Sequence, residues 1–145
     1  MRRVVVTGMG IVSSIGNNCA EVESALRETR SGIVASEEYR ELGFRSQVRG
    51  SIEIDLEAEI DRKLRRFMGA SAAYNYIARR EAITASGLGE SEISNPRTGL
   101  VVGTGGGSPE NIVAAADLLR QKGVKRVGPY ICLLYTSPSP RDRIA

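Results

Sequence analysis

The two cysteines, Cys19 and Cys132, are the strongest candidate nucleophiles in this sequence. Cys19 follows a predicted helix start, where the helix N-terminus can lower the pKa of a thiol. A cysteine nucleophile also needs a base, and the sequence contains no histidine. The missing histidine also removes the usual Ser-His and His-metal machinery. We therefore expect Cys19 to be a small packing residue, and we predict no catalytic residue and no metal site in this chain.

Two glycine-rich segments, Gly8–Gly10 and residues 104–108, each follow a short apolar run and could contact a phosphate. The first lacks the third glycine of the dinucleotide fingerprint, because that position is Ser13. The second lacks the Gly-Lys-Ser/Thr sequence of a P-loop. Glycine also allows another backbone to come close, which needs no side chain and explains both segments more simply.

Residues 61–66, Asp-Arg-Lys-Leu-Arg-Arg, form a basic run in a helix predicted over residues 56–67. Leu64, Phe67 and Met68 give this helix one apolar side, so most of the cationic side chains should face water. Such a run is ordinarily a solvated face. It can also steer an acidic partner and make association sensitive to salt.

The elements that must position these groups are those of an α/β fold. Val4–Thr7 and Leu100–Gly103 are predicted to be neighbouring central strands, because their apolar runs are typical of a sheet buried on both faces. Capping residues and apolar spacing predict the helices. We expect helices from Asn18 to Gly32, over 56–67, over 70–86 and over 109–122, a helical turn at 36–42 closed by Gly43, and short strands near 33–34 and 47–49.

Composition limits the class of protein. The chain has 145 residues, of which 41% are hydrophobic and 26% charged, so it should fold as one domain or part of a larger one. A net charge of +3 is too small to indicate nucleic-acid binding. No apolar run has membrane-spanning length, and the apolar stretch at the N-terminus is too short for a secretory signal. We expect a cytoplasmic protein without a disulfide framework.

Several motifs then occur in an order and at a spacing that resemble one family. That family is the bacterial 3-oxoacyl-[acyl-carrier-protein] synthases, the condensing enzymes of type II fatty acid synthesis. The resemblance covers residues 1–130, and glycine at position 106 resembles type I of the family. The motifs are residues 3–17, Ile60-Asp-Arg-Lys63, Arg66-Phe-Met68, Asn95-Pro-Arg97, Gly103-Thr-Gly-Gly-Gly-Ser-Pro109 and Val127-Gly-Pro-Tyr130.

This resemblance implies the N-terminal part of a thiolase-like layered α/β/α fold, incomplete here, from an enzyme that is a homodimer. The enzyme would transfer an acyl group from acyl carrier protein to a cysteine and then condense it, with decarboxylation, with malonyl-carrier protein. No metal or organic cofactor would take part. The family's nucleophilic cysteine and its two histidines lie beyond the matching region, so this chain alone should be inactive.

The resemblance also assigns binding residues. Arg62, Lys63 and Arg66 match positions that dock acidic acyl carrier protein, and Lys122 and Lys125 resemble a second basic contact. Gly106 matches a position at the floor of the acyl pocket.

Residues 131–145 depart from the family. From Cys132 onward they resemble a translated transposase-type sequencing adapter, so we expect a partial domain over 1–130 and a non-native tail over 131–145. Residues 132–145 should pack against nothing specific.

One alternative is a nucleotide-binding α/β domain of the short-chain reductase type, which would need Thr-Gly-x-x-x-Gly. Thr7 and Gly8 fit that pattern, whereas the next required glycine falls on Val12. A small non-catalytic interaction module is a further alternative, although the glycine loops and apolar runs argue against it.

Overall fold

The structure is a computed structural model that describes residues 3–135, so expectations for residues 136–145 lie outside the described part. The chain forms two compact units. The first comprises Met1–Asp55 and Asn75–Thr98, and the second comprises Leu56–Tyr74 and Gly99–Ala145. Among the described residues, no helix is long and apolar enough to cross a membrane.

In the first unit, α1 (Cys19–Arg27) begins where the sequence predicts. The side chain of Asn18 accepts the backbone N–H of Glu21 at 2.9 Å, and Glu21 accepts the N–H of Asn17 at 2.7 Å. These two bonds satisfy amide groups that the helix start leaves free. The helix ends at Arg27 rather than near Gly32, because Thr29 has a φ of 52° and the chain turns there.

The two short strands that the sequence predicts follow, and they pair as a small antiparallel hairpin. β1 (Ile33–Ala35) pairs with β2 (Val48–Gly50), with Val34 opposite Arg49. The connection contains α2 (Glu37–Glu41), capped by Ser36 and closed by Gly43, whose φ of 71° favours glycine. All three residues of each strand are exposed, so this hairpin is a surface element.

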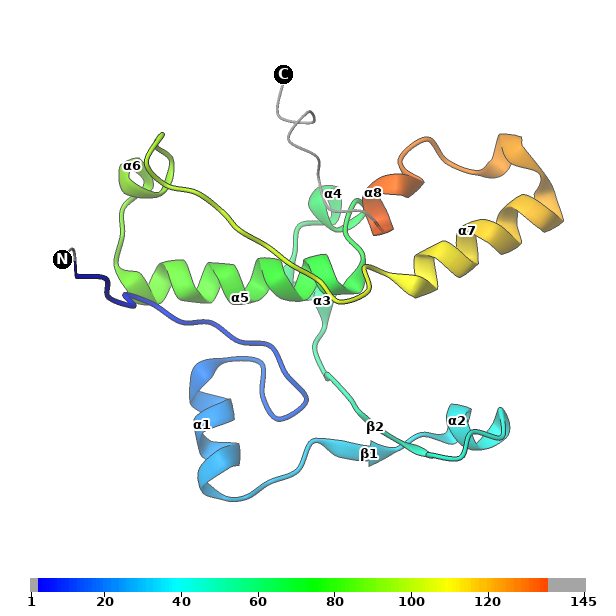
Figure 1. The fold of residues 1–145 in the computed structure, drawn as a ribbon, viewed down its shortest axis with the longest axis horizontal. Coiled ribbons are helices and arrows are strands. Elements are labelled where there is room, and N and C mark those ends of the chain that lie inside the picture. Colours follow the sequence, from blue (N-terminus) through cyan, green and yellow to red (C-terminus); the bar gives the residue numbers. More distant parts are fainter. Residues whose placement is uncertain (1–2, 136–145) are drawn as a thin grey trace. The chain divides into compact units, whose positions relative to one another are not determined.

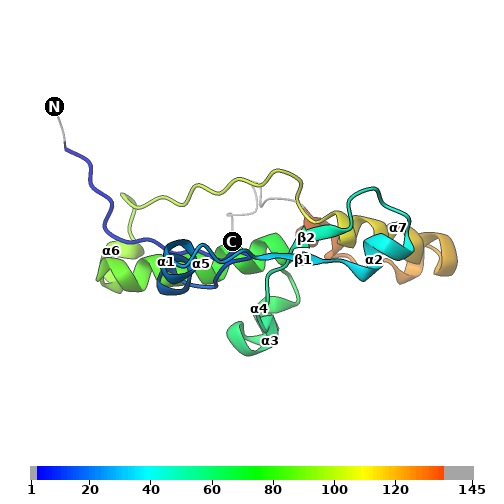
Figure 2. The ribbon, with the colours of Figure 1, turned by 90° about the horizontal axis from the view of Figure 1, so that it is seen from below.

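The N-terminal stretch lies against α5 (Ala70–Ser86) at backbone contact, as both views of the ribbon show (Figures 1 and 2). A Cβ on Gly10 would overlap the carbonyl group of Ala78, and a Cβ on Gly8 would overlap that of Ala82. Only glycine fits at both positions. The interpretation of Gly8–Gly10 as a close backbone approach is therefore confirmed.

The prediction that Val4–Thr7 and Leu100–Gly103 are central strands is wrong for this chain. Neither Val4–Thr7 nor Leu100–Gly103 forms a strand, and the sheet of the described residues contains only β1 and β2. Val4 is 93% exposed and Val101 is 97% exposed. A strand requires a second backbone to complete its hydrogen-bond ladder, and an apolar run does not provide that partner.

In the second unit, the predicted helix over 56–67 is divided into α3 (Leu56–Glu59) and α4 (Arg62–Arg65), which lie next to each other (Figure 2). The break occurs because Asp61 has a ψ of 133°, outside the helical region. Asp61 instead caps α4 by accepting the N–H of Lys63 at 2.8 Å. Helical spacing therefore does not relate the side chains of residues 56–59 to those of α4.

The remaining helices are α6 (Glu90–Ile93) in the first unit and α7 (Pro109–Lys122) in the second, followed by the 3₁₀ helix η1 (Val124–Arg126). α7 begins and ends as predicted. Its expected apolar face is open, with Ile112 47% exposed and Leu119 49% exposed.

The short helix α8 (Ile131–Tyr135) contacts α7, and a Cβ on Gly69 would lie 2.6 Å from the carbonyl oxygen of Leu134. The expectation that residues 132–145 pack against nothing specific is therefore wrong for residues 132–135.

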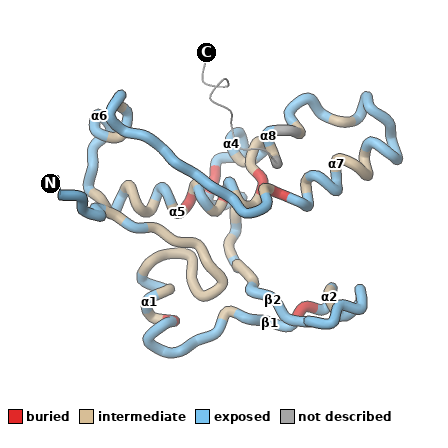
Figure 3. Tube along the Cα trace, in the orientation of Figure 1, coloured by how far each residue is buried: buried red, intermediate tan, exposed pale blue. Residues whose placement is uncertain are grey.

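The apolar core of the described residues is small (Figure 3). Ala25 and Ile77 are buried in the first unit, and Ile60 and Ala73 in the second. None of these is a large, fully buried side chain. Most large apolar side chains remain exposed, as expected for an incomplete fold.

Candidate functional site

The basic residues of α4 and Arg66, which follows it directly, form the first element of the candidate site and are called the α4 cluster. Arg62, Lys63 and Arg66 are exposed, and Arg65 is half-buried. Leu64 is 46% exposed, so the short helix presents its cationic side chains without burying a well-defined apolar face. A four-residue helix has little stability of its own. The cap from Asp61 and contacts beyond the helix must therefore hold these side chains in place.

Two of the arginines have such contacts. Nη1 of Arg65 donates to the carbonyl oxygen of Met68 at 2.5 Å, across the turn that leads into α5. The guanidinium of Arg66 lies 4.5 Å from the centroid of the Phe67 ring, a cation–π contact. Phe67 in turn packs edge-on against Tyr130 at 5.6 Å between centroids. These contacts restrict the positions of both guanidinium groups.

Three arginines surround one hollow of about 340 Å³ in the second unit. Arg62, Arg65 and Arg66 form no ion pair with any residue that the structure describes. Their positive charge therefore remains available to a ligand or partner. The residues lining the hollow are Glu57, Arg62, Arg65, Arg66, Met68, Asn111 and Leu134.

The second predicted basic contact lies apart from this hollow. Lys122 ends α7 and Lys125 lies in η1, and both are exposed. Asn111, which lines the hollow, lies in the first turns of the same helix. At about 1.5 Å per residue, Lys122 is roughly 16 Å further along the helix axis. The structure thus brings Arg62 and Arg66 together and places Lys122 and Lys125 elsewhere.

The second glycine-rich loop is anchored at its end. Ser71 Oγ donates to the carbonyl oxygen of Gly107 at 3.0 Å, and a Cβ on Gly69 would lie 2.9 Å from Ser108 Cβ. Gly106 itself is exposed and has no atom within 4 Å of a Cβ built on it. Its assignment to the acyl pocket stays a prediction.

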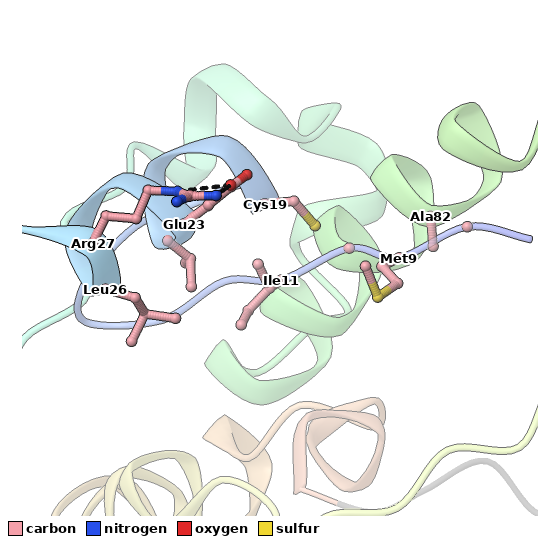
Figure 4. Close-up of a pocket in the computed structure, with 10 residues that line it drawn as sticks. Met9, Ile11, Cys19, Glu23, Leu26, Arg27 and Ala82 are labelled. Atoms are coloured by element: carbon pink, nitrogen blue, oxygen red, sulfur yellow. Dashed lines mark hydrogen bonds and ion pairs between the residues drawn. The ribbon is translucent and has the colours of Figure 1, made fainter. Parts of the chain in front are cut away.

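A larger hollow of about 790 Å³ lies in the first unit between the N-terminal stretch, α1 and α5 (Figure 4). Its wall is mainly apolar and includes Met9, Ile11 and Leu26. On α1, Arg27 forms an ion pair with Glu23 at 2.6 Å. The hollow suits an apolar occupant better than acid–base chemistry.

Cys19 also lines this hollow, and Glu81 determines its chemistry. Partial burial raises the pKa of the Cys19 thiol, and the charge and hydrogen bonding of the Glu81 carboxylate raise that pKa further. A raised pKa leaves less thiolate at neutral pH, so the helix start does not activate this cysteine. The expectation that Cys19 is not a nucleophile agrees with this environment.

Glu81 is a residue that the sequence reasoning missed. Its carboxylate accepts the backbone N–H of Cys19 and of Ile11. Partial burial acts to raise the pKa of Glu81, but these hydrogen bonds outweigh it and hold the pKa below the ordinary value of 4.5. The available signal was its spacing: Ala73 and Ile77 are buried on α5, and Glu81 is the next residue on that face.

Comparison with known families identifies the chain. The family described as "Beta-ketoacyl synthase, N-terminal domain" matches residues 1–137, and the chain belongs to this family. Its fold is accordingly the incomplete N-terminal part of the α/β ketosynthase fold. Nothing in the comparisons supports a short-chain reductase.

Individual relatives are more specific. The chain is 51% identical over 131 residues to 3-oxoacyl-[acyl-carrier-protein] synthase 1 of Haemophilus influenzae, covering 90% of this chain and 32% of the relative. A beta-ketoacyl synthase structure from Burkholderia phymatum matches with a TM-score of 0.74 and 29% identity, over 92% of this chain and 33% of that chain. The chain therefore spans about a third of the length of these relatives.

A third comparison includes a partner. It is a type II polyketide ketosynthase bound to its acyl-carrier protein, and it matches with a TM-score of 0.73 and 25% identity, over 94% of this chain and 35% of that chain.

Proposed function

We propose that this chain is the N-terminal part of an enzyme that extends acyl chains held on acyl carrier protein, and that Arg62, Lys63 and Arg66 dock that carrier protein. The observation that carries the proposal is the exposed α4 cluster, whose arginines form no ion pair with the described residues. Family membership and the names of the relatives support the reaction.

In the proposed reaction, a cysteine thiolate of the full-length protein takes the acyl group from one carrier protein. A malonyl group on a second carrier protein then loses CO₂, and its carbon attacks the acyl thioester. The new carbon–carbon bond gives a 3-oxoacyl-carrier protein and releases the cysteine. Residues 1–130 contain no histidine to move a proton, so their contribution to this reaction is to bind the carrier protein.

Carrier proteins are expected to be acidic, so a cluster of cations would attract them before contact. Charge complementarity of this kind raises association rates and weakens with salt. Arg62 and Arg66 would make the first contact. Lys122, roughly 16 Å along α7 from Asn111, and Lys125 in η1 would provide a separate contact. Gly106 would leave space at the floor of the acyl pocket once the rest of the protein is present.

The resemblance further predicts a cytoplasmic homodimer that needs no metal or organic cofactor. These statements depend on the family and not on a geometric feature of the described residues.

The test uses a full-length synthase that carries this N-terminal sequence. Arg62 and Arg66 are reversed to Glu, and carrier-protein binding is measured from low to high salt. We expect at least about tenfold weaker binding and a smaller salt dependence, because two attractive contacts become repulsive. Arg97→Glu, an exposed arginine in the first unit, is the matched control and should bind like wild type.

If the double variant folds and binds with wild-type affinity and salt dependence, the α4 cluster is only a solvated face. A loss of activity without loss of binding would also contradict a docking role.

A further inference from the structure

The hollow beside α4 has the composition of a site for a small oxyanion. Three guanidinium groups line it, from Arg62, Arg65 and Arg66, together with the single carboxylate of Glu57. Gathering three like charges is unfavourable unless an anion is present. None of the three arginines forms an ion pair within the described residues, so no described carboxylate neutralises them directly.

Arg65 shows the imbalance most clearly. It is half-buried, and one of its donors bonds to the Met68 carbonyl oxygen at 2.5 Å. Its Nε is buried without a hydrogen-bond partner among the described residues. A guanidinium that is partly desolvated and incompletely bonded is costly, and an anion bound to its other N–H groups would offset part of that cost.

Neighbouring groups restrict the ligand further. Asn111 Nδ2 donates to Ser108 Oγ at 2.7 Å, which leaves its second amide proton for a ligand. Arg66 is held over Phe67. Planar guanidinium groups at fixed positions match the oxygens of a phosphate better than a single carboxylate does, because phosphate can bond several donors at once.

We propose that this hollow binds a phosphate group, with Arg65 at its centre. Arg62, Arg66 and Asn111 complete the site, and all four proposed ligand-binding residues lie within residues 1–130. The proposal goes beyond carrier-protein docking, because Arg65 is not among the docking residues and the ligand is a small anion.

Inorganic phosphate is the probe, titrated by calorimetry into the full-length protein without carrier protein, at constant ionic strength. Acetate is titrated in parallel as a carboxylate of lower charge. We expect saturable phosphate binding, and little binding of acetate. Arg65→Gln should weaken phosphate binding about tenfold or more, since it removes a charge-assisted contact, whereas Arg65→Lys should weaken it less. Arg97→Gln should have no effect.

Absence of saturable phosphate binding would overturn the proposal, as would equal binding by wild type and a folded Arg65→Gln variant. Circular dichroism and thermal unfolding establish that each variant folds. If Arg65→Gln does not fold, the comparison of Arg65→Lys with wild type still decides the test. Because carrier protein is absent, failure here leaves the docking proposal intact. Conversely, if Arg62→Glu with Arg66→Glu leaves carrier-protein binding unchanged, the docking proposal fails, while saturable phosphate binding by the wild-type protein still supports the phosphate site.

Discussion

The carboxylate of Glu81 accepts the backbone N–H of Cys19 at 2.8 Å, although 62 residues separate the two. Its other oxygen accepts the N–H of Ile11 at 2.9 Å. One side chain of α5 therefore holds both the start of α1 and the N-terminal stretch. The negative charge also lies at the N-terminus of α1, where the helix dipole favours it.

This contact should make the first unit sensitive to acid. The folded pKa of Glu81 is lowered, so its stabilisation is complete above the ordinary value of 4.5 and is lost as pH falls through the folded value. Hydrogen exchange of peptides covering residues 9–20 should accelerate below about pH 4.5, beyond the intrinsic pH effect. Glu81→Gln should remove this pH dependence and cost about 1 kcal/mol at pH 7, since the site is only half-buried. Unchanged exchange in the variant would show that Glu81 is not a structural contact.

Cys19 should react slowly with alkylating reagents. Partial burial and the Glu81 carboxylate both raise the pKa of its thiol, so the thiolate fraction near pH 8 is below that of a free cysteine. Glu81→Gln should accelerate alkylation, because it removes the neighbouring negative charge. Site-resolved mass spectrometry with iodoacetamide measures this rate separately from that of the other cysteine. Faster alkylation of Cys19 than of free cysteine would contradict the assignment.

Alanine at Gly10 should be poorly tolerated. A Cβ there would overlap the Ala78 carbonyl, so α5 and the N-terminal stretch must move apart. Forced overpacking of this kind typically costs about 1–3 kcal/mol. Gly105→Ala is the matched control, because no atom lies within 4 Å of its Cβ position. Urea unfolding of the full-length protein compares the two; equal midpoints would mean that the close approach is not maintained.

The two basic contacts should act independently on carrier-protein binding. Lys122 lies roughly 16 Å along α7 from Asn111 and the arginine hollow. Substitutions that far apart usually add within about 0.5 kcal/mol. A double-mutant cycle of Arg62→Ala and Lys122→Ala should therefore give a coupling energy near zero. A large coupling energy would indicate that both side chains contact the same group of the partner.

The 145-residue chain by itself should not condense acyl groups. It contains no histidine, and the environment of Cys19 suppresses thiolate formation. Acyl- and malonyl-carrier protein should therefore yield no 3-oxoacyl product when incubated with the purified chain, as measured by mass spectrometry. Product formation above a no-enzyme control, with contaminating synthase excluded, would refute this expectation.

Local signals in the sequence predicted the helices well. α5 spans Ala70–Ser86 and α7 spans Pro109–Lys122, as expected, because caps, glycines and apolar spacing act within a few residues. The short strands β1 and β2 were also indicated by the sequence, whereas their pairing into a hairpin was not predicted. The division of the basic helix was missed because the backbone of Asp61 turns out of the helical region.

Features that depend on distant residues were not predictable in this way. Val4–Thr7 was expected to be a central strand, yet an apolar run does not say whether a partner strand is present. The role of Glu81 depends on amide groups 62 and 70 residues away. For the candidate site, resemblance indicated Arg62 and Arg66, whereas the contribution of Arg65 required the contact with Met68.

The contact of α5 with the N-terminal stretch also sets an order of events during synthesis. Glu81 emerges from the ribosome 70 residues after Ile11. At roughly 5–20 residues per second, the first residues wait about 4–14 s for their partner. During this interval residues 8–11 cannot dock on α5 and remain available to chaperones or to other nascent chains. Slower translation would lengthen this exposure without altering the final structure.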